Sequence, residues 1–93
     1  MKEIIEVLRH FRVKYYSLSI SYTFKDPFNT EYVLEVGCDG ITFKKFPYFN
    51  NFNDDNLIID YKFELDKNID PIKTSLYEIF CILSDKGIVI KFI

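Results

Sequence analysis

The chain has 93 residues, of which 48% are hydrophobic and 18% aromatic, and this composition excludes a disordered polypeptide. Its length suits a single α+β domain with one hydrophobic core, which we assign to residues 1–93. The formal net charge of −2 argues against a general attraction to nucleic acid, and no apolar run approaches the roughly 18 residues that a membrane span requires.

Residues 2–11 are predicted to form an amphipathic helix, because their apolar side chains recur at helical spacing. The apolar stripe consists of Ile4, Ile5, Leu8 and Phe11. Glu3 and Glu6 on the opposite side distinguish this segment from a signal peptide. The two cysteines, Cys38 and Cys81, lack the spacing of a disulfide framework or a metal site. These features predict a cytoplasmic protein with reduced thiols.

Residues 15–24 show the clearest alternation in the chain and predict one long strand. Its larger apolar residues are expected to face the core, and its hydroxyl residues are expected to face outward. The inward set is Tyr16, Leu18, Ile20, Tyr22 and Phe24, and the outward set is Ser17, Ser19, Ser21 and Thr23. A turn is predicted next, at Asp26 and Pro27.

Residues 31–46 predict a β-hairpin, because two alternating runs flank Asp39 and Gly40. A two-residue turn at these positions requires positive φ angles, which Gly adopts freely and Asp tolerates. This turn would place Val36 opposite Phe43 on the core face of the sheet.

Three further elements are predicted after the hairpin. Residues 57–65 alternate again and predict a strand. Residues 70–86 predict a helix, with Asp70 as its N-cap and Gly87 in the left-handed position that ends it. The apolar and β-branched residues 88–93 predict a final strand.

The predicted order of elements is therefore α-β-β-β-β-α-β, which is an α+β fold. A helical crossover would place the last strand beside the first, so we expect a five-stranded, mostly antiparallel sheet with strand order 5-1-2-3-4. Both helices would cover one face, which makes a two-layer sandwich with the other face open. The expected core consists of Leu18, Ile20, Tyr22, Leu34, Val36, Phe43, Ile59, Tyr61, Phe63, Leu76, Ile79, Phe80 and Leu83.

The predicted first half of the chain, a short helix, a strand and a hairpin that turns at Asp39 and Gly40, resembles the layout of small phage inhibitors of a CRISPR nuclease. This resemblance covers residues 2–46. It implies an anti-CRISPR-like inhibitor that acts by binding a protein partner, and it carries no functional residue onto this chain.

The loop of residues 46–55 combines aromatic and acidic side chains, which suits a protein interface because aromatic residues anchor partners and acidic residues steer basic ones. The predicted partner-binding residues are Tyr48, Phe49, Phe52, Asp54 and Asp55. They indicate a non-enzymatic protein-binding module, namely a small intracellular inhibitor or immunity-type protein whose partner has a basic surface. The alternative for this loop is that Phe49 and Phe52 fold back and plug the end of the core.

A basic cluster near the N-terminus supports an alternative function. Its residues are Arg9, His10, Arg12 and Lys14. They favour a small nucleic-acid-binding or accessory subunit, in which cations contact phosphates. The predicted open sheet face lacks the aromatic residues on which bases stack, so a nucleic acid ranks below a protein partner.

No residue pattern indicates catalysis or a cofactor. His10 is the single histidine and has no predicted partner for general-base chemistry. The three glycines stand apart, so no phosphate-binding loop is predicted. The acidic run of residues 54–70 lacks the glycine-containing pattern of a calcium loop. We therefore expect neither a cofactor nor a metal, and the third hypothesis, a small enzyme or ligand-binding domain, has no assigned site.

Overall fold

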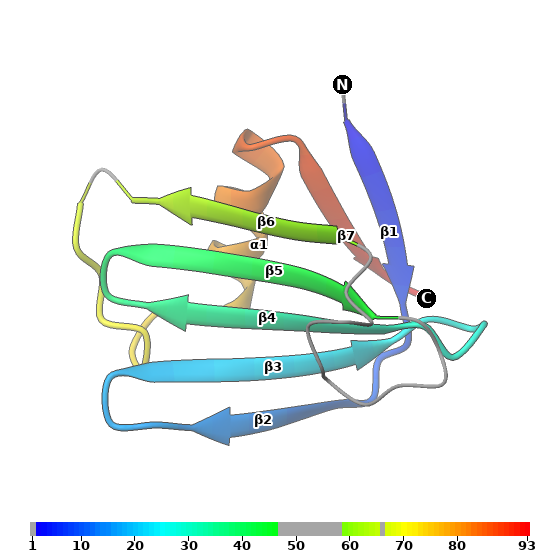
Figure 1. Ribbon diagram of the computed structural model, residues 1–93, viewed down its shortest axis with the longest axis horizontal. Helices are drawn as coiled ribbons and strands as arrows, with labels where there is room; N and C mark the ends of the chain where they lie inside the picture. Colours follow the sequence, from blue (N-terminus) through cyan, green and yellow to red (C-terminus); the bar gives the residue numbers. More distant parts are fainter. Residues whose placement is uncertain (1, 47–58, 66) are drawn as a thin grey trace.

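Two β-sheets and one helix make up the computed structural model, which describes residues 2–46, 59–65 and 67–93 (Figure 1). The elements in chain order are β1 (Glu3–Val7), β2 (Phe11–Tyr15), β3 (Ser19–Lys25), β4 (Glu31–Gly37), β5 (Gly40–Phe46), β6 (Ile59–Glu64), α1 (Leu76–Asp85) and β7 (Ile88–Phe92). Strands β2 to β6 form an antiparallel sheet in sequential order, and β1 and β7 form a small parallel sheet. The protein is thus mostly β.

The predicted α+β sandwich with two helices and strand order 5-1-2-3-4 is wrong. The last strand does not join the large sheet. Instead β7 pairs in parallel with β1, from Glu3 opposite Ile88 to Val7 opposite Phe92. α1 lies behind the large sheet and is the single helix among the described residues (Figure 1). The meander of the four predicted strands is confirmed as β3 to β6, and β2 adds a fifth strand at its start.

The N-terminal segment is a strand and not the predicted helix. Ile5 and Val7 are buried, whereas Ile4 and Glu6 are exposed, so the segment buries every second residue as a strand does. Its β-branched residues favour this conformation. The N–H of Glu3 also donates to the carbonyl of Gly87, directly before β7, at 2.8 Å. The element order that resembled phage inhibitors is therefore not present.

The long strand predicted over residues 15–24 is broken by a turn that makes β2 and β3 a hairpin. The N–H of Tyr16 donates to the carbonyl of Ser19 at 2.8 Å and closes this turn. Tyr16 and Leu18 were expected in the core but are exposed, with Leu18 79% exposed. From Ile20 to Phe24 the predicted inward face is confirmed.

The predicted hairpin of β4 and β5 is confirmed, but its register is wrong. Val36 pairs with Ile41 instead of Phe43, and Phe43 lies opposite Leu34. The shift amounts to two residues along β5. Because side chains alternate with a period of two, each side chain keeps the face that was predicted for it.

Hydrogen bonds from the segment that follows β6 explain this register. The N–H of Leu65 donates to the carbonyl of Asp39, and the N–H of Ile69 donates to the carbonyl of Cys38, both at 2.8 Å. Neither Asp39 nor Gly40 has a positive φ, so the turn is not of the predicted type. Cys38 lies in the turn and is exposed.

Helix α1 begins later than predicted. Asp70 caps a separate turn, in which its Oδ1 accepts a hydrogen bond from the N–H of Ile72 at 3.0 Å. The N-cap of α1 is Ser75, whose Oγ accepts from the N–H of Glu78 at 3.2 Å. The predicted end is confirmed, since Gly87 follows the helix with a φ of 95°.

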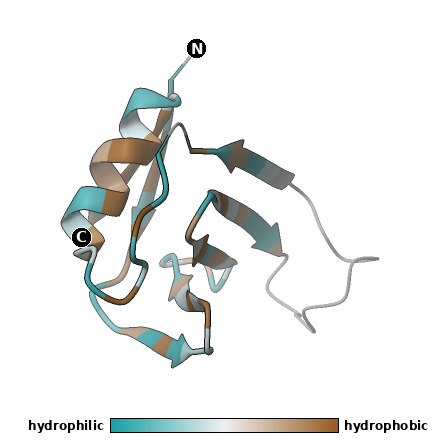
Figure 2. Cartoon of the chain, turned by 90° about the vertical axis from the view of Figure 1, so that its left-hand side faces the viewer, coloured by the Kyte–Doolittle hydropathy of each residue, from teal (hydrophilic) through white to brown (hydrophobic). Residues whose placement is uncertain are grey.

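The core lies between the large sheet, α1 and the β1–β7 pair. Apolar residues alternate with polar ones along the strands (Figure 2), and α1 buries Ile79 and Leu83. The predicted core residues that are confirmed as buried are Ile20, Tyr22, Leu34, Val36, Phe43, Ile79 and Leu83, and those that are partly buried are Tyr61, Phe63, Leu76 and Phe80. The side chain of Ile59 lies outside the described residues. No helix among the described residues is long and apolar enough to cross a membrane.

Phe24 connects the parts of this core. Its ring lies 5.1 Å from that of Phe11, 6.0 Å from that of Phe80 and 6.1 Å from that of Phe92, measured between centroids. These contacts join β3 to β2, to α1 and to β7. Such aromatic pairs stabilise a fold beyond the area that they bury.

Replacing Phe24 with Ala should lower the free energy of unfolding by about 3–5 kcal/mol, because the buried ring leaves a cavity. Leu18→Ala is the matched control and should change it by less than about 0.5 kcal/mol, because that side chain is exposed. Chemical denaturation measures both values. A comparable loss in the two variants would contradict the turn between β2 and β3.

Candidate functional site

The face of the large sheet that points away from α1 is polar and hollowed. The hollow has a volume of about 520 Å³. Its lining residues come from β2 to β5 and from the β2–β3 turn, and they are Arg12, Val13, Lys14, Tyr16, Ser21, Thr23, Val33, Glu35, Lys44 and Phe46. Hollows of this size accommodate a small ligand or a few side chains of a partner.

Three cations surround this hollow, whereas Glu35 is the single carboxylate among its described lining residues. Lys14 has no carboxylate within ion-pair distance among the described residues. Its Nζ lies 5.4 Å from the centroid of the Tyr16 ring, a distance at which a cation and an aromatic face attract each other. The described lining of the hollow is therefore basic, although the whole chain is slightly acidic.

A buried carboxylate lies next to Arg12 on the same sheet face. Glu31 is only 7% exposed. Its Oε2 is 3.6 Å from Nη2 of Arg12, and its Oε1 is 3.6 Å from Nζ of Lys25. Oε2 accepts no hydrogen bond from the described residues, so these contacts are ion pairs at longer range. One carboxylate between two cations leaves a positive charge at this end of β2.

Strand β2 forms the exposed edge of the large sheet. Among the described strands it pairs with β3 alone, and it lies at the lower border of the sheet in Figure 1. All five of its residues are exposed. Phe11, Val13 and Tyr15 lie opposite Phe24, Tyr22 and Ile20 on the side that faces the core, although Tyr15 is 68% exposed and Val13 also borders the hollow. Arg12 and Lys14 lie on the side of the hollow. The strand therefore presents an apolar row on one side and a basic row on the other.

One side of the β2 backbone pairs with no other described strand. Because the N–H of Tyr16 bonds to Ser19, the hydrogen-bonded pairs of this antiparallel ladder include Arg12 and Lys14. The N–H and C=O groups of Phe11, Val13 and Tyr15 then point away from β3, along the open edge. An extended chain could pair with these groups.

The other edge of the large sheet, β6, is different. Tyr61 and Phe63 are partly buried in the core, and exposed Lys62 and Glu64 alternate with them. The hydroxyl of Tyr61 donates to Oε2 of Glu3 at 2.7 Å, which ties this strand to β1. This bond and the partial burial of Tyr61 and Phe63 distinguish β6 from the exposed strand β2.

The structure separates the residues of the predicted basic cluster. Arg12 and Lys14 lie on β2 and line the hollow. Arg9 and His10 lie in the connection between β1 and β2 and are exposed. Arg9 is directed to the other side, where its Cζ lies 6.0 Å from the centroid of the Phe92 ring. Two of the four residues therefore form part of the candidate site.

The predicted partner-binding residues lie outside the described residues, and these are Tyr48, Phe49, Phe52, Asp54 and Asp55. The sequence pattern placed Tyr15, Tyr16 and Leu18 in one long strand and did not predict that they are exposed around the β2–β3 turn. A signal was present, because residues 11–15 alternate strictly between apolar and basic. The predicted helix obscured it.

Comparisons with family models, with curated proteins and with solved structures found no match for this chain. The hollow and the exposed strand β2 are therefore the features from which a function is inferred. Among the described residues, no three His, Cys, Asp or Glu side chains are arranged to hold a metal ion.

Tyr32 is a buried titratable group at the end of the sheet where Asp26 shapes the β3–β4 turn. The Oδ1 of Asp26 accepts the N–H groups of Phe28 and Thr30, both at 2.9 Å, and its Oδ2 accepts the hydroxyl of Tyr32 at 3.4 Å. Burial, followed by the negative charge of Asp26, raises the pKa of Tyr32 to about 12. The folded protein thus holds this phenol neutral at a pH at which an unfolded tyrosine ionises.

Absorbance titration of the tyrosines should show a late ionisation near pH 12 that is absent from Tyr32→Phe. Because the unfolded state releases this proton first, from about pH 10, the free energy of unfolding should fall as the pH rises from 10 to 12. In Tyr32→Phe, the contribution of this phenol to the decrease in the free energy of unfolding should be absent. Tyr77→Phe is the control, since its ring is exposed and should leave the late step unchanged. A late step that persists in Tyr32→Phe would refute the assignment.

Proposed function

We propose that the protein is a non-enzymatic protein-binding module, a small cytoplasmic inhibitor or immunity-type protein that acts by occupying the surface of a protein partner. The observation that supports this proposal is the exposed edge strand β2, with its apolar row and its hairpin tip. A sheet edge of this kind is a template for pairing with another chain.

The side chains at this edge suit the anchors of an interface. Tyr15, Tyr16 and Leu18 are all exposed, and they lie in succession at the end of β2 and in the turn to β3. Tyrosine is enriched among residues that contribute most to binding energy. The turn is held by the bond from Tyr16 to Ser19, so little conformational freedom is lost when a partner binds.

Binding at a sheet edge favours inhibition as the mode of action. A partner segment bound at the edge of β2 would be covered by this protein, so the proposed mode of action is to block that segment. The loop of residues 46–55, with its acidic and aromatic residues, remains a predicted second contact for a basic region of the partner.

The basic hollow favours a second candidate function, the binding of a nucleic acid. Arg12, Lys14 and Lys44 could contact phosphates, and Tyr16 offers one ring for stacking. Glu35 within the hollow and the negative net charge of the chain oppose it. Protein binding therefore remains the first proposal.

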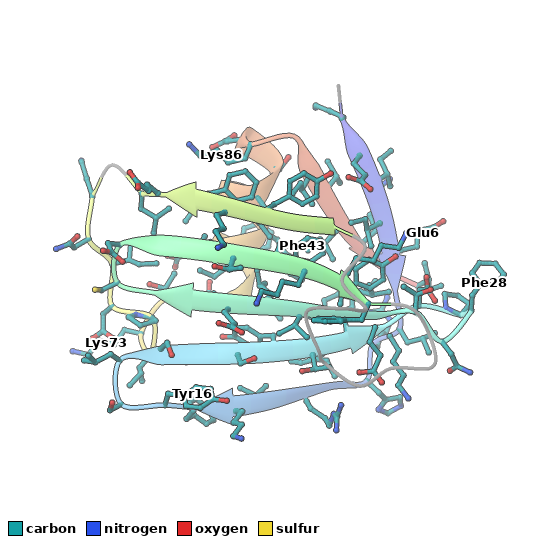
Figure 3. The ribbon with its side chains drawn as sticks, viewed as in Figure 1. Glu6, Tyr16, Phe28, Phe43, Lys73 and Lys86 are labelled. Atoms are coloured by element: carbon teal, nitrogen blue, oxygen red, sulfur yellow. The ribbon has the colours of Figure 1, made fainter. Side chains whose placement is uncertain are left out.

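Capture of partners from the native host by the tagged protein tests the proposal. The variant Tyr15→Asp/Leu18→Asp should lose at least tenfold in affinity for the captured protein, because two exposed anchors are removed. Its thermal unfolding should be unchanged. Phe28→Asp is the matched control, because Phe28 is 82% exposed and lies at the opposite end of the sheet from Tyr16 (Figure 3).

A salt series separates the two candidate functions. Binding of a labelled oligonucleotide that falls steeply with salt and is abolished in Lys14→Glu would support the nucleic acid. Partner binding that survives in Tyr15→Asp/Leu18→Asp would contradict the role of the β2 edge. Capture of nucleic acid without any specific protein would overturn the proposal as a whole.

A further inference from the structure

We infer that the partner contributes an extended segment that pairs with β2 as a sixth strand of the large sheet, with acidic residues on the side of the hollow and apolar residues on the other. This inference rests on the proposed protein-binding function and specifies its geometry. It assigns a chemical pattern to the partner that can be tested with a synthetic peptide.

The backbone of β2 supplies the first argument. The outward N–H and C=O groups of Phe11, Val13 and Tyr15 follow one another at every second residue, as in any edge that accepts a strand. Addition of a strand to such an edge is a common mode of peptide recognition, in which backbone bonds give affinity and alternate side chains give specificity.

The side chains of β2 supply the specificity. On the side of the hollow, Lys14 lacks an ion-pair partner among the described residues, and Arg12 shares Glu31 with Lys25. Opposite charges on neighbouring strands attract each other, so this side favours acidic residues in the added strand. On the other side, the row of Phe11, Val13 and Tyr15 favours apolar residues.

The same charges oppose a second copy of this chain as the occupant. If β2 paired with β2 of another copy through its outward groups, Arg12 and Lys14 would face Arg12 and Lys14 of that copy. Like charges directly opposite each other destabilise a sheet. Basic residues on an edge strand are a known protection against self-association. The edge is therefore selective for a different, acidic chain.

The experiment uses a capped seven-residue peptide in which Glu and Val alternate, added to the isotopically labelled full chain. Amide resonances report weak binding as well as tight binding. The largest shifts are expected at Phe11, Val13 and Tyr15. A peptide with Lys in place of Glu should bind at least tenfold more weakly, and Lys14→Glu should reverse this preference.

Val13→Pro is the decisive variant. The N–H of Val13 points outward, so proline removes a donor to the added strand while the bonds between β2 and β3 remain. Affinity for the peptide should fall at least tenfold. Val13→Thr is the matched control, since it keeps both the N–H and a β-branched side chain, and it should bind as the unmodified protein does.

Two results would overturn the inference. One is an absence of shifts at the three β2 amides at millimolar peptide, and the other is a concentration-dependent change at these amides without peptide, which would indicate self-association. If a captured partner binds the unmodified protein and Val13→Pro equally well, the sixth strand is refuted while the protein-binding function stands. If no partner is captured, the function itself fails.

Discussion

The parallel pairing of the first strand with the last is the constraint on which the rest of this structure depends. Ile5, Val7, Ile88 and Ile90 are buried by this pairing, which closes one end of the core. β1 and β7 form their ladder of backbone hydrogen bonds with each other. Neither of them pairs with a described strand of the large sheet. The strand next to β3 is then β2, which has no further neighbour in the part of the chain that the structure describes. The same pairing that completes the core therefore leaves the edge on which the proposed function depends.

The aromatic contacts around Phe24 keep this edge in place. Phe11 at the start of β2 stacks on Phe92 at the end of β7, with 5.9 Å between ring centroids, and it also contacts Phe24. The start of β2 is thus held by the core, while its end at Tyr15 is exposed. The core contacts of Phe11 and the backbone hydrogen bonds to β3 order β2 before a partner binds. This order lowers the entropic cost of binding.

Charge is distributed unevenly over the molecule. The net charge of −2 suggested little attraction for anions, yet the hollow next to β2 has three cations and one carboxylate among its described lining residues. Attraction between a partner and a surface depends on nearby charges, because salt screens those beyond about 10 Å. A local basic surface on an acidic chain is therefore compatible with an acidic partner segment. The amino-acid composition alone does not reveal such a surface.

Local patterns in the sequence determined those elements that depend mainly on residues nearby in the chain. The β4–β5 hairpin, the positions of β6 and β7 and the end of α1 at Gly87 follow from alternation and from turn or capping residues. Only the tertiary structure decided the N-terminal segment, because Ile4, Ile5 and Leu8 fit a helical stripe as well as a strand. The choice depends on β7, the element farthest away in the chain, and no local pattern encodes such a partner. The register of the β4–β5 hairpin was decided in the same way, by hydrogen bonds from Leu65 and Ile69.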